Sequence, residues 1–111
     1  ENNALTGIDL SKNKELMQLR IDNNQVKQLD VSKCKKLTDL SFTYNPITLA
    51  KVAVGTVMMT GMPSSSFVST NPSVVGPTSE GRGLIAKKKG STTIIYDQGE
   101  EDEWTFKVNV L

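Results

Sequence analysis

The side chains that could do chemistry in this chain are few, and most of them are charged. The 111 residues include no histidine and a single cysteine, Cys34. A His-based catalytic triad and a transition-metal site depend on these residue types, so neither is expected. The serine run Ser64–Ser66 carries no nucleophile motif. We therefore predict a protein that is not an enzyme and uses no metal or cofactor.

Acidic residues are densest in the run Glu100-Glu101-Asp102-Glu103. Four carboxylates could collect Ca²⁺, but an oxygen cage usually draws ligands from alternate positions around a glycine-bearing turn. The run lacks that spacing and lies between two strand-like segments, so a solvated hairpin loop is favoured over a cation site. Trp104 follows directly, and we expect it in the core or at its rim rather than on a stacking platform.

Basic residues recur at matched positions in the first part of the chain. They are Lys12, Lys14, Lys33, Lys35 and Lys36. If these segments stack, the lysines form a basic ladder that could attract an acidic glycan, a teichoic-type polymer or a lipid headgroup. The alternative is a solvated loop that was copied when the repeat was duplicated. A second group, Lys87–Lys89, ends a predicted strand and suits edge protection and solubility.

The overall charge limits the partners that we expect. The chain has 13 Lys and Arg against 12 Asp and Glu, a net charge of +1. This balance argues against a dedicated nucleic-acid binder. The sequence has no apolar run of the roughly 18 residues that a membrane span requires. We expect no nucleic-acid partner and no transmembrane segment in this chain.

The elements that position these side chains follow an internal repeat. Apolar triplets begin 11, 10 and 11 residues apart: Leu5-Ile8-Leu10, Leu16-Leu19-Ile21, Val26-Leu29-Val31 and Leu37-Leu40-Phe42. Residues 5–25 laid over residues 26–46 give seven identities, so the unit is 21 residues long. A fixed period of this length predicts stacked coils, each completing its neighbour's core.

The repeat resembles the short leucine-rich repeat of bacterial proteins. Its L-x-x-L-x-L-x-x-N signature is carried by Leu16-Leu19-Ile21-Asn24 and by Leu37-Leu40-Phe42-Asn45. The resemblance implies parallel strands, inward asparagines and a partner-binding concave face, whose candidate residues are Gln18, Arg20, Asp22, Asp39, Ser41 and Thr43. Cys34 occupies an inward column, where a buried thiol is favoured over a reactive one.

From residue 48 onward, short β-type runs alternate with turns, which predicts a small antiparallel sandwich. This part resembles the group-2 bacterial immunoglobulin-like domain. The matching segments are Val54-Gly55, Ser69 to Val75, Gly83 to Ile94 and Phe106-x-Val108-x-Val110. We therefore expect a mainly β protein: a leucine-rich-repeat solenoid of about two coils at residues 1–47, joined to an Ig-like β-sandwich at residues 48–111.

A short array needs a cap, because a terminal coil exposes its apolar edge. Residues 47–54 hold apolar residues too often for a free linker, so we expect them to cap the last coil and to serve as the sandwich's first strand. The opposite end, around Ala4, Leu5 and Ile8, is expected to lack a cap.

Together the two resemblances imply an exported bacterial protein, extracellular or at the cell surface, with no signal sequence in this chain. We predict a non-catalytic binding or adhesion protein that contacts a protein or polysaccharide and acts as a monomer or as part of a longer chain. A structural spacer with no ligand of its own is the alternative, followed by an intracellular scaffold.

Overall fold

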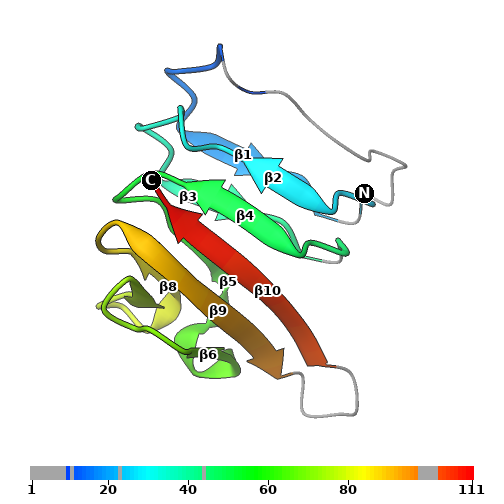
Figure 1. Ribbon diagram of the computed structural model, residues 1–111, viewed down its shortest axis with the longest axis vertical. Helices are drawn as coiled ribbons and strands as arrows, with labels where there is room; N and C mark the ends of the chain where they lie inside the picture. Colours follow the sequence, from blue (N-terminus) through cyan, green and yellow to red (C-terminus); the bar gives the residue numbers. More distant parts are fainter. Residues whose placement is uncertain (1–9, 11, 23, 44, 98–102) are drawn as a thin grey trace.

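Two five-stranded sheets form the protein (Figure 1). The computed structural model describes residues 10, 12–22, 24–43, 45–97 and 103–111. The first sheet has the order β1 (Gln18–Arg20), β3 (Asp39–Ser41), β5 (Val57–Pro63), β8 (Arg82–Ala86) and β7 (Val75–Pro77). The second has the order β2 (Gln28–Asp30), β4 (Leu49–Val52), β10 (Glu103–Val110), β9 (Gly90–Asp97) and β6 (Phe67–Ser69). A 3-10 turn, η1 (Ser64–Ser66), precedes β6.

The 21-residue period sets the pairing of the repeat strands. β1 and β3 are parallel, with Leu19 opposite Leu40, and β2 and β4 are parallel, with Leu29 opposite Ala50. Both pairs are offset by one full repeat, so equivalent residues of successive coils are neighbours. One coil therefore contributes a strand to each sheet, and the turns between these strands stack at the ends.

Both sheets are mixed, and this changes the expected architecture. In the first sheet β3 pairs with β5 in parallel, while β5, β8 and β7 are antiparallel. In the second sheet β10 pairs with β4 in parallel over Lys107–Val110, and β10, β9 and β6 are antiparallel. The mainly β class is confirmed, but the expectation of a separate solenoid and sandwich is not, because each sheet continues from the repeat strands into the second half. The division at residues 47 and 48 stays a prediction.

A single apolar cluster lies between the sheets and includes side chains from both halves. Leu40, Phe42, Met58, Ile94 and Phe106 are essentially inaccessible to solvent. Of the repeat residues expected inside, Ile21, Leu29, Val31, Leu37, Leu40 and Phe42 are buried. Leu16 and Leu19 are only partly buried, because β1 is an edge strand with a neighbour on one side.

The segment at residues 47–54 closes the last coil as a strand shared by both halves. Ile47, Ala50 and Val52 are buried, and β4 pairs with β2 on one side and β10 on the other. Val54, the last apolar residue of this segment, is 46% exposed, because it lies in the turn after β4. The expectation about Ala4, Leu5 and Ile8 falls outside the described residues.

Candidate binding surface

Polar side chains of β1 and β3 form an ordered array, here called the repeat-strand face. The Arg20 guanidinium lies 2.8 Å from the Asp39 carboxylate, measured from Nη2 to Oδ2. Gln18 Nε2 donates to the same oxygen at 3.2 Å. Gln18 is opposite Asp39 and Arg20 is opposite Ser41 in the strand register. Candidate residues that are 21 positions apart in the sequence are therefore direct neighbours, as the repeat predicts.

Asp22 organises the end of this face. Its Oδ1 accepts hydrogen bonds from Ser41 Oγ, Thr43 Oγ1 and the Thr43 backbone N–H, each at 2.7 Å. Partial burial raises the pKa of Asp22, but the hydrogen bonds from Ser41 and Thr43 and the nearby Arg20 outweigh it, so the pKa lies below its ordinary value of 3.8. Asp22 is thus an anion at neutral pH, with both hydroxyls fixed toward it.

A hollow of about 190 Å³ lies where the repeat-strand face meets β5. Arg20, Asp22, Ser41 and Thr43 line one side of it, and residues 59–62 line the other. The register of β5 against β8 shifts between Met58 and Pro63, which marks a bulge. Met59 has the left-handed φ of 58°, a conformation that costs energy for a residue with a side chain.

Close packing maintains this bulge. Gly83 has a φ of 72°, and a Cβ there would lie only 2.9 Å from the Met59 carbonyl carbon, so a larger residue does not fit. Arg82 donates to the Thr60 carbonyl through Nε at 3.0 Å and to the Gly61 carbonyl through Nη2 at 2.6 Å. The wall of the hollow is therefore fixed by specific contacts.

One acceptor on the repeat-strand face has no donor. Asp39 Oδ1 is shielded from solvent and has no hydrogen-bond partner within the part of the chain that the structure describes. Such a group is costly unless a donor reaches it. The Arg20 side chain is 54% exposed and Gln18 is exposed, so the face offers guanidinium and amide groups to a hydroxyl- or amide-bearing ligand.

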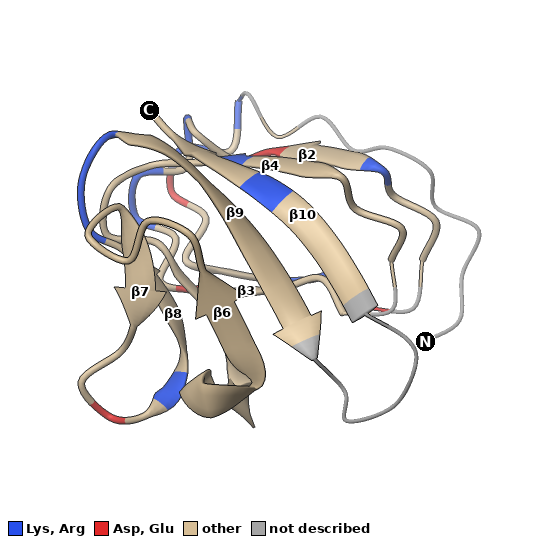
Figure 2. Ribbon diagram, turned by 60° about the horizontal axis from the view of Figure 1, so that its bottom comes forward, with Lys and Arg blue, Asp and Glu red and all other residues tan. Residues whose placement is uncertain are grey.

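The basic ladder lies on turns away from the repeat-strand face. Lys12, Lys14, Lys33 and Lys35 are exposed on two adjacent turns. Lys36 Nζ lies 2.6 Å from Glu15 Oε1, and Cys34 Sγ lies 3.7 Å from the Leu10 carbonyl oxygen, so both contacts join these turns. Figure 2 shows the lysine-bearing turns gathered at one edge of the fold. The structure thus brings the ladder together but separates it from Arg20 and Asp22.

The remaining candidates are Cys34, Trp104 and the acidic run, and the first two are packed into the fold. Cys34 is completely buried. Burial raises the pKa of its thiol, and the negative charge of the nearby Asp30 raises it further. Trp104 packs against Phe42 and Phe106 and donates from Nε1 to the Ile47 carbonyl at 3.1 Å, which confirms its place at the rim of the core. Glu100–Asp102 lie outside the described residues. Within the described residues, no cluster of His, Cys, Asp and Glu could hold a metal, and no helix is long and apolar enough to span a membrane.

Sequence reasoning did not single out the outer face of the second sheet. A shallow hollow of about 500 Å³ there is lined by Leu49, Thr70, Ser91, Thr92, Thr93, Lys107 and Asn109. The alternating pattern along β9 and β10 is visible in the sequence, but the pairing of β10 with β4 is not. Only that pairing brings Leu49 and Lys107 side by side.

Comparison with known proteins does not assign this chain to a family. No protein-family model, curated protein or solved structure matches it.

Proposed function

We propose that this protein is a non-catalytic binding or adhesion protein of a bacterial cell surface or secreted fraction. Its binding surface is the one built by the leucine-rich-repeat-like coils, and its partner is a protein or a glycan. The second half is an Ig-like sandwich that shares its sheets with the coils. The partner and the compartment rest on the resemblance of residues 5–46 and 52–111 to these two kinds of module.

One observation carries the proposal: the ordered polar array across β1 and β3. Gln18 and Arg20 both donate to Asp39, and Asp22 accepts from Ser41 and Thr43 at the next position. Side chains already held in one arrangement lose little conformational entropy on binding a ligand. Two neighbouring strands are too few for a standard protein interface of about 800 Å² per partner. A glycan, or a portion of a larger protein surface, suits this area better.

The test is equilibrium binding of the intact chain to an array of glycans and to cell surfaces. The variant Gln18→Ala/Arg20→Ala removes two members of the array. Lys27→Ala/Gln28→Ala is the matched control, since it removes the same kinds of side chain from β2 and its preceding turn. We expect binding that falls at least tenfold in the first variant and is unchanged in the second. Equal binding by both variants would contradict the proposed face.

A structural spacer is the second candidate, and the shared sheets favour it. Since β4 pairs with both β2 and β10, the two halves form one continuous body that could project another domain stiffly. Complete absence of binding by the intact chain, with a longer parent protein, would support the spacer over the adhesion protein.

A further inference from the structure

The topology of the second sheet brings two separate lysine groups to one edge. β2, β4 and β10 run parallel, so their C-terminal ends meet at the same edge of the sheet. β9 is antiparallel to β10 and begins there, with Gly90 opposite Val110. Lys87–Lys89 immediately precede β9, and Lys33, Lys35 and Lys36 lie in the turn that follows β2. The lysines of the basic ladder and those of the β8–β9 turn therefore lie along one side.

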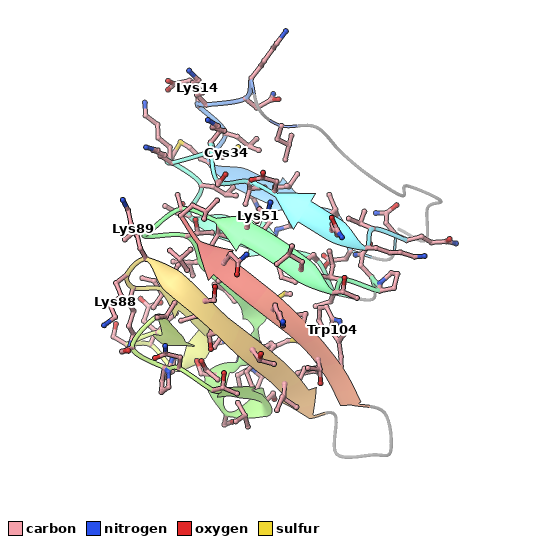
Figure 3. All side chains as sticks on the ribbon, viewed as in Figure 1. Lys14, Cys34, Lys51, Lys88, Lys89 and Trp104 are labelled. Atoms are coloured by element: carbon pink, nitrogen blue, oxygen red, sulfur yellow. The ribbon has the colours of Figure 1, made fainter. Side chains whose placement is uncertain are left out.

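The figures agree with this placement. Lys14, Lys88 and Lys89 project on the same side of the fold in Figure 3. The turn after β4 lies between the two groups, since Gly55 N–H donates to the Ala86 carbonyl at 2.8 Å and Leu111 N–H donates to the Val52 carbonyl at 2.9 Å. Adjacent strands are about 4.8 Å apart, so the lysines span roughly 15–20 Å. We call this array the basic edge: Lys12, Lys14, Lys33, Lys35, Lys36, Lys87, Lys88 and Lys89.

The basic edge concentrates positive charge in a chain that is almost neutral overall. It holds eight of the 13 Lys and Arg residues, although the net charge of the protein is only +1. The acidic side chains described on or beside these turns already have partners. Glu15 pairs with Lys36, and Asp30 accepts from Ser32 Oγ at 2.6 Å. Lys36 is neutralised by Glu15, and Asp30 lies near Lys33, so among the described residues the edge presents more ammonium groups than carboxylates.

We propose that the basic edge binds an extended polyanionic glycan, with Lys87–Lys89 as part of the same site as the repeat lysines. This inference rests on the proposed binding function and names its partner class. The positive charge of the lysines favours an anionic partner. Because the lysines follow one side of the fold, a linear polymer can contact more of them than a planar membrane surface can. The edge consists of lysines without arginine or aromatic side chains, whereas single-stranded nucleic acids are bound by stacking on aromatics and Arg.

The test measures the affinity of the intact chain for heparin, alginate and polyglycerol phosphate, which present sulfate, carboxylate and phosphate on comparable polymers. Two edge variants, Lys33→Gln/Lys35→Gln and Lys88→Gln/Lys89→Gln, each remove two charges. Lys27→Gln/Lys107→Gln removes the same charge away from the edge. A single-stranded oligonucleotide and phosphatidylserine vesicles are the competing partners, and circular dichroism verifies that each variant is folded.

We expect both edge variants to weaken glycan binding roughly 30-fold, at about fivefold per lysine, and the control to change it less than threefold. Salt should weaken the wild-type complex steeply. The three polymers then show which anion the edge prefers. An effect in the Lys33/Lys35 variant alone, an equal effect in the control, or tighter binding to the oligonucleotide or vesicles would overturn the inference. Failure to bind any polyanion would also overturn it, while binding through Gln18 and Arg20 would leave the proposed function standing.

Discussion

Trp104 and Ile47 are 57 residues apart in the sequence, yet the Trp104 indole donates a hydrogen bond to the Ile47 carbonyl at 3.1 Å. Ile47 belongs to the end of the repeat and Trp104 to the last strand, and Trp104 also stacks edge-on against Phe42 at 5.8 Å. The contact joins the two halves across their shared core. A protein built in this way is expected to fold as one unit.

The first prediction is cooperative unfolding. Because one core includes Phe42 and Phe106 from different halves, Trp104 fluorescence and far-ultraviolet circular dichroism should report the same transition in urea. Trp104→Phe keeps an aromatic ring but leaves the Ile47 carbonyl without this donor, at a cost of about 1–3 kcal/mol. Two separated transitions would contradict the shared core.

The second prediction concerns two equivalent leucines of the repeat. Leu40 is fully buried, so Leu40→Ala should lower the free energy of unfolding by about 2–5 kcal/mol. Leu19 is only partly buried on the edge strand β1, so Leu19→Ala should cost distinctly less. Urea denaturation of both variants makes the comparison, and equal losses would show that β1 is covered in solution.

The third prediction concerns pH. The folded-state pKa of Asp22 lies below its ordinary value of 3.8, so the ionised carboxylate stabilises the folded protein above that pH. This contribution should disappear as the pH falls from 3.8 through the folded-state pKa. Asp22→Asn removes the titration. The difference in unfolding free energy between wild type and variant should therefore be constant above pH 5 and should shift steadily below pH 4. If this difference in unfolding free energy were independent of pH, the hydrogen bonds from Ser41 and Thr43 would not stabilise the ionised form of Asp22.

The fourth prediction uses Cys34 as a reporter of unfolding. The side chain is completely buried and its thiol pKa is raised, so little thiolate is present and reagents cannot reach it. Modification by a disulfide reagent should be slow in buffer and become fast across the urea transition measured for Trp104. Rapid labelling of the native protein would contradict this prediction and show that the Cys34 thiol is reactive.

Much of the repeat could be predicted from the sequence, because its signal is periodic. The 21-residue spacing places Leu19 opposite Leu40. The inward role of Asn45 also follows, since its side-chain amide donates to the Ile21 and Phe42 carbonyls at 2.9 and 3.1 Å. These features depend on contacts between equivalent positions, which the sequence itself aligns.

What could not be predicted depends on contacts between dissimilar segments. The alternating pattern of β10 specifies which residues are buried but not that the strand pairs in parallel with β4, a partner 58 residues away. For the same reason the sequence left Lys87–Lys89 as an isolated group. Their position beside the repeat lysines requires the direction of β2, β4, β10 and β9 together. The exposure of Val54 depends on a turn, with Gly55 at a φ of 96°, that is not apparent from hydrophobicity.

Amide chemical-shift mapping can show whether a ligand binds to the surface built by the coils. The ¹⁵N-labelled chain would be titrated with each polymer or protein that the intact protein captures. We expect saturable shifts at residues 18–22 and 39–43 or along the basic edge, with the outer face of β9 and β10 unaffected. Absence of shifts with every ligand, or shifts confined to that outer face, would contradict it.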